Sequence, residues 1–599
     1  MRWLFLLVGA AVLAVVAVVI ILFPSSSERP VASSSSTPKP SRTVSTPPPP
    51  KVKEFTDPCG TFDTTTKNFY AVTGYWITPK SNPCTWRHQL QEIHRAGGDT
   101  IIRIGYGLQF RSVSDDTGEV LAKDGTLDPL YKACEEDGLS CHDAAERDLR
   151  KANPGNRIGR TYVYRTDEAF GGDLFRCPKM EHAVKAGDRI YYRMVAPPDG
   201  SDDATCDFTK KATSYDLILV AGSAKDSLAE LLDLADQFSM RVFPALPLAP
   251  RDSETPTRAN KRHIGTLTTL TRRILQDYGV RFADRQALGG VYQPFEVQMG
   301  ATLATNPTLE VYADQHRIVE QELGKPILIS PYLDARKRVG FGQTPAQVAE
   351  AFKALARTGV GIIAPQDSRG TGKVGLFWPD ERDTEVDDRL RPVVGEATYG
   401  TAYHGSTRDY YREMAKARDE MLQAGHEVEL WANVEAFEPS GKQPCAPQGT
   451  RGQTDKKRLD QAVTMAGRYV QKIVSYMWSD FMTCGDPSLQ DEIAGDWQRP
   501  IAVDAIRRPR DPQDGVEVRG YNLDGSTVLV EWSGGTKELV VAAVGWLDKD
   551  PLDEHPARMA TAWVPFDWTQ VPPGEWVKIG IKGASGKEAT TPLHVRISA

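Results

Sequence analysis

Two glutamates stand at the ends of short apolar segments, a pattern that predicts a catalytic pair of carboxyl groups. Glu435 ends the apolar part of Glu427–Pro439 (EVELWANVEAFEP), and Glu296 ends Gly289–Glu296 (GGVYQPFE). A short strand that ends in an acid is typical of a parallel barrel, which carries its reactive side chains at the C-terminal ends of its strands. Two such carboxyl groups suit glycosidic bond cleavage, in which one protonates the leaving oxygen and the other attacks or activates water.

Three polar residues near this pair are candidates for supporting roles. Asp367 is predicted to orient a sugar hydroxyl, to replace Glu296 as the acid, or to cap the turn that follows it. Asn433 lies two residues before Glu435, so both side chains face the same side of a strand, where Asn433 is placed to bind a sugar 2-hydroxyl. Arg103 is predicted either to pair with Glu435 and keep it ionised, or to be a structural arginine of the barrel.

Aromatic side chains near the ends of the expected strands are candidates for stacking on sugar rings. For each ring alone, packing in the core is the alternative interpretation, whereas we expect the set as a whole to be partly exposed. The candidates are Trp76, Tyr292, Tyr332, Trp378, Trp431 and Trp478.

Apolar strands alternate with helical patterns from the residues near Tyr70 onward. Eight such units in succession predict an α/β fold with a TIM (β/α)8 barrel, whose chemistry lies at the C-terminal ends of the strands. The alternative, a doubly wound open sheet, lacks the GxGxxG or P-loop signature of a nucleotide-binding sheet. The expected strands are Tyr70–Ile77, Asp99–Tyr106, Arg241–Leu246, Gly290–Gln293, Pro326–Ser330, Val360–Pro365, Glu427–Asn433 and Lys472–Trp478.

A long polar insertion, residues 109–214, follows the second expected strand. It contains extended pieces at Thr161–Arg165 and Arg189–Val195, and Tyr215–Ala221 reads as one more strand of the same insertion. We expect the insertion to form one wall of the site, because it leaves its strand at the C-terminal end of the barrel.

The last hundred residues lose the helical periods. Short strands separated by turn signals predict a small β-sandwich of immunoglobulin or fibronectin-like type. We assign residues 57–495 to the barrel and residues 496–599 to the sandwich, which either binds glycan or braces the barrel. The expected strands are Ser526–Trp532, Leu539–Gly545, Thr561–Val564, Trp576–Ile581 and Leu593–Ile597.

The N-terminus predicts a membrane anchor within residues 1–23. Trp3–Phe23 is an unbroken apolar run of a length that spans a bilayer, and no small-residue cleavage site follows it. Arg2 precedes the run, and the positive end of such a span stays in the cytoplasm. Residues 24–56, rich in Ser, Thr and Pro, predict a semi-rigid spacer. We therefore expect a single-pass membrane protein whose catalytic domain is extracytoplasmic.

Charge and cysteine count restrict the partners and the compartment. Lys and Arg number 72 against 79 Asp and Glu, and no basic block interleaves with aromatics, so nucleic acid is not an expected partner. The 8 cysteines predict disulfides in an exported chain. Neighbour-to-neighbour pairing gives Cys134–Cys141, Cys177–Cys206 and Cys445–Cys484, among others. No CxxC or Cys/His spacing indicates zinc, and we expect no metal and no cofactor.

The ends of the expected strands form an ordered set of motifs: GGVYQPFE, PILISPYLD, GIIAPQDSRG and ELWANVEAFEP, with LADQFSMRVFPALP and IVSYMWSDF. From about Tyr70 to Thr483, the insertion apart, this set resembles the bacterial glycosidase-like TIM-barrel family catalogued as domain of unknown function 4434. The resemblance implies a barrel related to the retaining clan A glycoside hydrolases. It also implies that Glu296, after strand four, is the acid/base and that Glu435, after strand seven, is the nucleophile. Phe295 departs from the pattern, because clan A enzymes commonly place Asn before the acid/base.

Two classes of function follow from these observations. We expect an extracytoplasmic retaining glycoside hydrolase that acts on a cell-envelope or extracellular polysaccharide. The alternative is a non-catalytic glycan-binding or envelope-assembly protein on the same barrel. An open site that contains Glu296 and Glu435 favours the hydrolase, whereas an acid that is turned away or salt-bridged into the core favours the binding protein.

Overall fold

The structure is a computed structural model, and the part of the chain that it describes belongs to one compact unit, Asp57–Ala599. The predicted membrane span Trp3–Phe23 and the spacer at residues 24–56 lie outside the described residues. Within the described residues, no helix has the length and apolar character needed to cross a membrane. The described residues are 59–60, 63–201, 205–210, 213–439, 451–547, 556 and 558–596.

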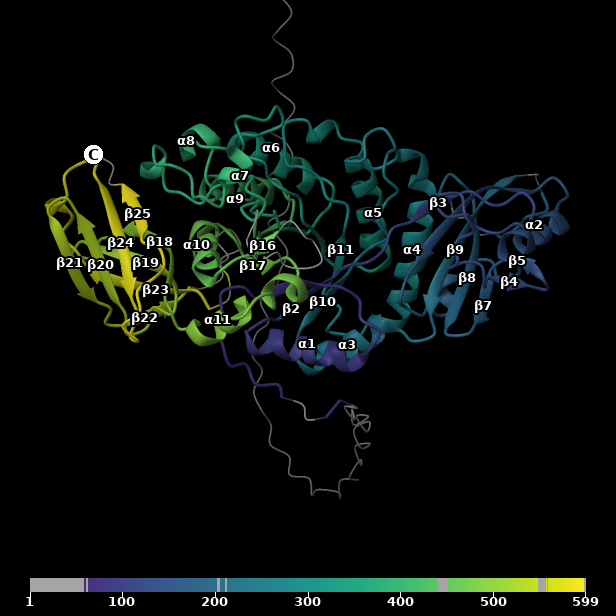
Figure 1. Ribbon diagram of the computed structural model, residues 1–599, viewed down its shortest axis with the longest axis horizontal. Coiled ribbons are helices and arrows are strands. Elements are labelled where there is room, and N and C mark those ends of the chain that lie inside the picture. Colours follow the sequence, from purple (N-terminus) through teal and green to yellow (C-terminus); the bar gives the residue numbers. More distant parts are fainter. Residues whose placement is uncertain are drawn as a thin grey trace, which may run out of the picture. The chain divides into compact units, whose positions relative to one another are not determined.

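Eight parallel strands form a barrel, in the order β10-β2-β1-β17-β14-β13-β12-β11. The two outer strands of this order meet through parallel bridges between Val242 and Leu288 and between Ala245 and Tyr292. The predicted eight-stranded barrel is therefore confirmed (Figure 1). Its strands are β1 (Gly74–Ile77), β2 (Thr100–Arg103), β10 (Arg241–Pro244), β11 (Val291–Gln293), β12 (Ile327–Ile329), β13 (Ile362–Ile363), β14 (Glu429–Val434) and β17 (Lys472–Ser475).

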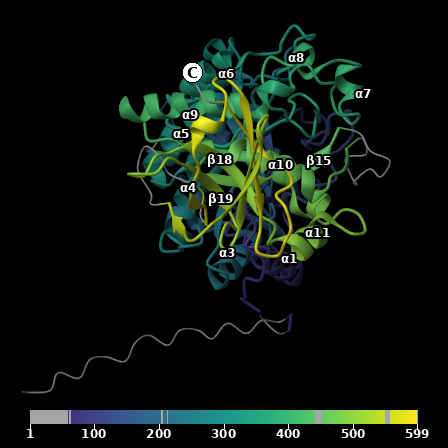
Figure 2. The same cartoon turned by 90° about the vertical axis from the view of Figure 1, so that its left-hand side faces the viewer.

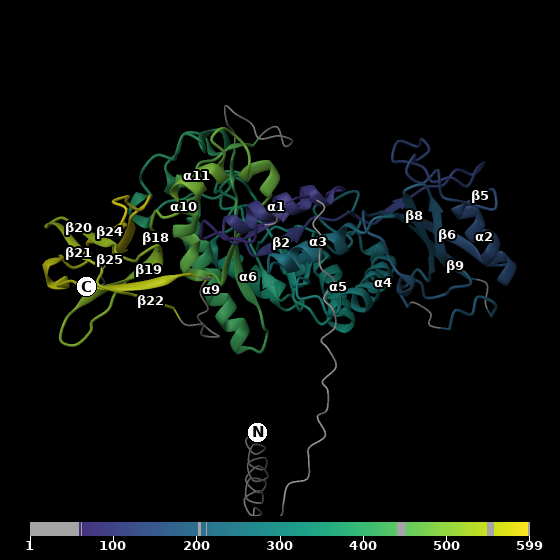
Figure 3. The ribbon, with the colours of Figure 1, turned by 90° about the horizontal axis from the view of Figure 1, so that it is seen from below.

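Helices cover the outside of the barrel. Several begin at capping boxes: Thr344 and Gln347 exchange side-chain and backbone hydrogen bonds at the start of α6, as Ser406 and Asp409 do at α9. Figure 3 shows α1 and α3, which pack together, next to each other. The helices are α1 (Pro83–Arg95), α3 (Ser227–Gln237), α4 (Ile264–Phe282), α5 (Thr308–Glu322), α6 (Pro345–Ala356), α7 (Arg391–Val394), α8 (Tyr399–Ala402), α9 (Thr407–Gln423), α10 (Lys456–Ala466) and α11 (Leu489–Asp496).

Aromatic side chains fill the inside of the barrel. The rings of Trp76 and Tyr292 meet edge to face at 5.9 Å between their centroids, and those of Phe243 and Trp431 do so at 6.1 Å. Side chains alternate between the two faces of a strand, so Ile77, the residue after inward-facing Trp76, faces outward. Arg103 pairs with Ile77 and therefore lies on the helix side of the barrel wall. The interior is thus a packed core, as in other barrels of this size.

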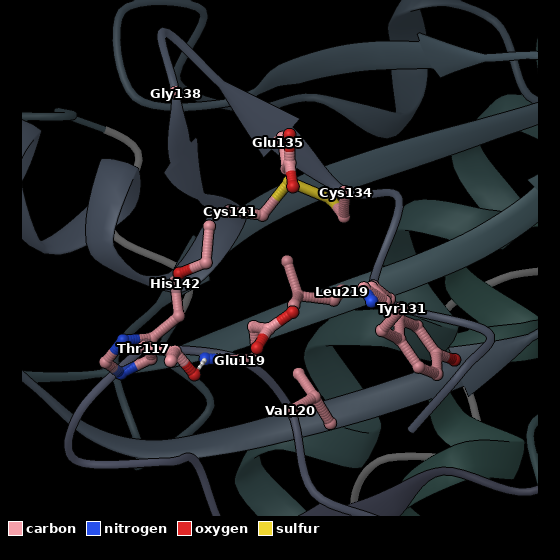
Figure 4. A pocket seen from close by; sticks show the side chains of 13 residues that line it. Thr117, Glu119, Val120, Tyr131, Cys134, Glu135, Gly138, Cys141, His142 and Leu219 are labelled. Atoms are coloured by element: carbon pink, nitrogen blue, oxygen red, sulfur yellow. Dashed lines mark hydrogen bonds between the residues drawn. A yellow bond between two sulfur atoms is a disulfide. The ribbon is translucent and has the colours of Figure 1, made fainter. Parts of the chain in front are cut away.

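The insertion folds into its own five-stranded sheet, in the order β3-β6-β9-β8-β7. The extended pieces predicted within it are strands β6 and β8, and the further predicted strand is β9. A hairpin and α2 border a pocket whose lining includes His142 and the disulfide of Cys134 and Cys141 (Figure 4). The elements are β3 (Gln109–Arg111), β4 (Glu135–Glu136), β5 (Leu139–Ser140), α2 (Cys141–Ala152), β6 (Arg157–Arg165), β7 (His182–Ala186), β8 (Arg189–Ala196) and β9 (Ser214–Ser223).

The insertion packs along the outer side of α4. Its buried Glu181 accepts two hydrogen bonds from Arg273 of α4, at 2.6 and 2.7 Å. Asp277 of α4 in turn accepts from the backbone N–H of Gly171 at 2.6 Å. Figure 1 shows the sheet of the insertion, in blue, beyond α4. These buried polar contacts hold the insertion against α4, and its predicted place as one wall of the site stays a prediction.

Three disulfides confirm neighbour-to-neighbour pairing in the described part of the chain: Cys59–Cys84, Cys134–Cys141 and Cys177–Cys206. Cys484 is also disulfide-bonded. Its predicted partner, Cys445, lies outside the described residues, so this pair stays a prediction. Peptide mapping without reduction is expected to recover the peptides of Cys445 and Cys484 linked to each other, and free thiols at both positions would contradict it.

The C-terminal strands form two four-stranded antiparallel sheets, β18-β19-β23-β22 and β21-β20-β24-β25, and their buried side chains share one core. Strand β18 packs on α10 (Figure 2). Strands β18 and β19 were not among the predicted strands, and buried Glu517 and Arg519 of β19 bond each other at 3.2 Å. The strands are β18 (Ile501–Arg507), β19 (Gly515–Tyr521), β20 (Thr527–Trp532), β21 (Gly535–Val540), β22 (Val544–Trp546), β23 (Ala560–Pro565), β24 (Trp576–Lys582) and β25 (Leu593–Arg596).

Candidate active site

Polar side chains join the ends of four neighbouring barrel strands. The backbone of Gln366, beyond β13, forms parallel β-bridges with Tyr332, beyond β12, and with Asn433 of β14. The side-chain amide of Gln366 donates to Glu296, beyond β11, at 3.0 Å. The side-chain amide of Asn433 donates to the hydroxyl of Ser330 at 3.0 Å. The mouth of the barrel therefore brings Glu296 and the end of β14 into one polar layer.

Glu435 lies at the end of β14 and is 2% exposed. Its carboxylate Oε2 accepts a hydrogen bond from the backbone N–H of Thr371 at 3.1 Å. Burial and the nearby charge of Asp367 raise the pKa of the Glu435 carboxyl from 4.5 to about 8, although Arg451 and Arg369 oppose this rise. Both burial and the neighbouring charge thus favour the protonated form of Glu435.

Asp367 is fully buried beside Glu435. Its Oδ1 accepts from the backbone N–H groups of Arg369 and Glu435, each at 3.2 Å, which is the turn-capping role predicted as one alternative. Burial raises the pKa of Asp367 to about 6, against the opposing charge of Arg369. A negative charge on Asp367 favours the protonated form of Glu435.

The loop after β13 packs tightly on the chain after β14. Ser368 adopts a left-handed backbone with a φ of 53°, which is uncommon for a residue with a side chain. A Cβ atom on Gly370 would lie 2.6 Å from the carbonyl oxygen of Phe437, so only glycine allows this approach. This close packing aims the N–H of Thr371 at the carboxyl of Glu435.

Glu296 differs from Glu435 because its side chain reaches solvent. The pKa of the Glu296 carboxyl is raised overall, because desolvation outweighs the hydrogen bond from Gln366 and the charges of Arg251, Arg451 and Lys373, which lower it. Contact with water and these three cations both favour the charged form of the carboxyl. Both carboxyl groups thus have raised pKa values, and the rise is larger for Glu435, which is buried.

Arg103 does not pair with Glu435. Its guanidinium donates to Glu168 and to Asp167 of the insertion, each at 2.6 Å, and to the hydroxyl of Ser227 at 2.8 Å. The alternation of side chains along β2 explains the difference, because Arg103 lies on the helix side of the barrel wall. Arg103 is therefore the structural arginine of the two alternatives, and its predicted role in binding substrate is wrong.

Most of the predicted sugar-stacking rings belong to the core. Trp76, Tyr292 and Trp431 fill the barrel interior, and each is buried. Trp478 packs edge to face on Tyr75, outside the barrel wall, at 4.7 Å. Trp378 stacks on a histidine of the C-terminal sheets at 5.2 Å. Tyr332 is the half-buried member of the set and the one that lies at the mouth.

Five residues of the mouth were not predicted. Thr371 contributes only its backbone N–H, and Gln366 and the three cations lie in loops. Loops have no hydrophobic period from which a role could be predicted. Gln366 carried the one available signal, because it lies two residues after the inward-facing Ala364 and so faces the mouth. The five are Gln366, Thr371, Arg251, Lys373 and Arg451.

Comparison with known families assigns the part of the chain that holds both glutamates. The family model described as "Domain of unknown function (DUF4434)" matches residues 205–490. This part of the chain is a DUF4434 domain. The resemblance seen in the strand-end motifs is confirmed for that range. Strands β1 and β2 precede it, and they complete the barrel of the DUF4434 domain by pairing with β17 and β10.

The insertion matches a family model of its own. A second model, "Domain of unknown function (DUF8405)", matches residues 122–220, which covers most of the insertion. No curated protein matches the chain. Within the described residues, no group of three or more His, Cys, Asp and Glu is arranged to hold a metal ion.

Several solved structures of carbohydrate-active proteins are distantly similar. The C-terminal domain of Legionella pneumophila ChiA shares 11% identity over 71% of this chain and 96% of its own, with a TM-score of 0.27. A Paenibacillus polymyxa xyloglucanase from glycoside hydrolase family 44 shares 10% over 57% and 84%, with a TM-score of 0.25. A putative alpha-galactosidase from Bacteroides fragilis shares 12% over 56% and 64%, with a TM-score of 0.24. Similarity at this level carries no argument, and the barrel rests on its own strand pairing.

Proposed function

We propose that the protein is a glycoside hydrolase whose active site is the mouth of the DUF4434 barrel. The observation that carries this proposal is the contrast between two carboxyl groups at the ends of β11 and β14. Glu435 is buried in surroundings that favour its protonated form, and Glu296 reaches solvent among cations. Acid-assisted cleavage of a glycosidic bond requires two carboxyl groups whose surroundings favour different protonation states.

The protonation states assign a role to each carboxyl group. Glu435 donates its proton to the oxygen of the leaving sugar, and the carboxylate of Glu296 attacks the anomeric carbon. This assignment reverses the one that the family resemblance implies. Water then hydrolyses the glycosyl intermediate with Glu435 as base, so the configuration is retained. Proton NMR of the first product formed distinguishes retention from inversion.

The alternative function, glycan binding without turnover, is less well supported. An acid salt-bridged into the core would favour it. Within the described part of the chain, neither Glu296 nor Glu435 forms an ion pair, and their side-chain hydrogen bonds come from an amide and from a backbone N–H. Neither carboxyl group is therefore fixed in an ion pair, although that of Glu435 is buried.

Hydrolysis is tested by incubating the purified full-length protein with cell-envelope polysaccharides and looking for released oligosaccharides by mass spectrometry. The wild-type protein is expected to release them, and the Glu296→Gln protein is not. If no polysaccharide is cleaved but one binds to both proteins, the glycan-binding function replaces this proposal.

The pH dependence of kcat/KM is expected to report the proton on Glu435. Because this carboxyl must be protonated to act as the acid, kcat/KM should fall as the pH rises through about 8. Asp367→Asn removes the charge that helps to raise this pKa, so it should move the alkaline limb of the profile to lower pH. A kcat/KM that instead rises through about pH 8 would show that Glu435 acts ionised, in the role that the resemblance implies.

We also propose an extracytoplasmic location with a membrane anchor at Trp3–Phe23. The three disulfides support it, because disulfides persist in oxidising compartments outside the cytoplasm. Protease added to intact spheroplasts is expected to digest the barrel while the membrane fraction keeps the N-terminal peptide. Protection of the barrel until the cells are lysed would contradict this topology.

A further inference from the structure

Three cationic side chains surround the mouth of the barrel, and each lies over an aromatic ring near the end of a strand. They come from different segments: the loop after β10, the loop after β13 and the chain that follows β14. Arg251 is exposed, and the other two are half-buried. The pairs, with distances to the ring centre, are Arg251 over Phe295 at 5.0 Å, Lys373 over Tyr332 at 4.6 Å and Arg451 over Phe437 at 4.3 Å.

These cations differ from the arginines around them because they lack acidic partners. Arg336 pairs with Asp334 at 2.7 Å, and Arg369 pairs with Glu438 at 2.9 Å. In the described part of the chain, none of the three cations forms an ion pair. Arg251 donates instead to a backbone oxygen at 2.7 Å. The positive charges of all three side chains act on the carboxyl of Glu296.

Three neighbouring positive charges are unfavourable unless an anion binds among them. Like charges that lie close together around one carboxyl group repel each other. A neutral sugar offers hydroxyl groups but no charge to offset this repulsion. Carboxylate or phosphate groups would offset the repulsion, because guanidinium and ammonium groups form their strongest hydrogen bonds with these anions.

We propose that the mouth of the barrel binds an acidic glycan, one whose sugars carry carboxylate or phosphate groups, through Arg251, Lys373 and Arg451. This inference rests on the proposed function, since it names the substrate class of the same site. The three cations hold the anionic groups of sugars on either side of the cleaved bond, and the rings beneath them limit where those groups sit.

Binding is measured by calorimetry with the full-length Glu435→Gln protein, so that turnover does not interfere. The carboxylate probes are polygalacturonate, polymannuronate and hyaluronan, each compared with its own carboxyl-reduced, neutral form. A glycerol phosphate polymer provides the phosphate probe. We expect at least one acidic polymer to bind roughly 10-fold more tightly than its neutral counterpart, with an affinity that falls as salt is added.

Single variants locate the anion site. Lys373→Ala and Arg451→Ala are each expected to weaken binding of the preferred polymer roughly 10-fold. Lys416→Ala removes an equally charged side chain from the exposed face of α9, where it pairs with Glu413, and is expected to leave binding unchanged. An equal loss in Lys416→Ala would show that only the overall charge matters and would overturn the proposal.

The outcomes also separate this inference from the proposed function. If every acidic polymer binds no more tightly than its neutral form while a neutral glycan is hydrolysed, the acidic substrate class is wrong and the hydrolase stands. If an acidic polymer binds with the expected dependence on Lys373 and Arg451 but the wild-type protein does not cleave it, the anion site stands and hydrolysis fails.

Discussion

Glu296→Gln is expected to lower kcat for glycan hydrolysis by roughly 10⁴- to 10⁶-fold, because a neutral amide cannot attack the anomeric carbon. Glu435→Gln is expected to lower kcat by roughly 10²- to 10⁴-fold for the natural glycan, whose leaving oxygen needs a proton. For an aryl glycoside of the same sugar, whose leaving group departs without a proton, the Glu435→Gln protein should keep much more of its activity. Steady-state kinetics with both substrates measures this difference.

The control for both variants is Glu350→Gln, which makes the same chemical change on the exposed face of α6 and should leave kcat unchanged. Circular dichroism of each variant shows whether it folds. If the leaving-group dependence appears in Glu296→Gln rather than in Glu435→Gln, the two roles are exchanged. Full activity in either variant would remove that residue from the mechanism.

Arg273→Met is expected to destabilise the contact between the insertion and the barrel by roughly 3–5 kcal/mol, because it leaves the carboxylate of Glu181 buried without its cation. Both side chains of this pair are almost completely buried. Glu181 also accepts backbone N–H groups of the insertion, at 2.7 Å from Arg176, 2.8 Å from Cys177 and 3.0 Å from Val195. Hydrogen exchange of these three amides therefore reports the local opening directly.

An exposed ion pair between Arg285, just after α4, and Asp233 of α3 provides the control. Arg285 pairs with Asp233 at 2.5 Å, but both side chains are about two-fifths exposed. Arg285→Met should therefore change stability by roughly 0–1 kcal/mol. In the double variant Arg273→Met/Glu181→Gln no charge is left unpaired and the amide oxygen still accepts backbone N–H groups, so it should lose less stability than the Arg273→Met single variant. Equal exchange at the three amides in the wild-type and Arg273→Met proteins would show that the ion pair does not hold the insertion.

The location of the candidate pair could be predicted from the sequence, whereas its protonation could not. An acid that directly follows an apolar strand must emerge at the C-terminal end of a parallel barrel, so Glu296 and Glu435 both reach the mouth. The proton on Glu435 depends on Asp367, which lies 68 residues away in the sequence and within hydrogen-bond distance of the Glu435 backbone. No local pattern records such a contact.

The sequence by itself determined the strands and helices of the barrel, because helix and strand periods and turn residues act over a few neighbouring positions. It therefore predicted the eight strands, the separate insertion and the neighbouring disulfides. Only the tertiary structure decided which charges meet. Arg103 turns to the insertion instead of to Glu435, Arg273 neutralises Glu181, and three loop cations gather at the mouth. The physical reason is that burial and Coulomb interactions depend on distance in space, and residues far apart in the chain become neighbours only when the barrel closes.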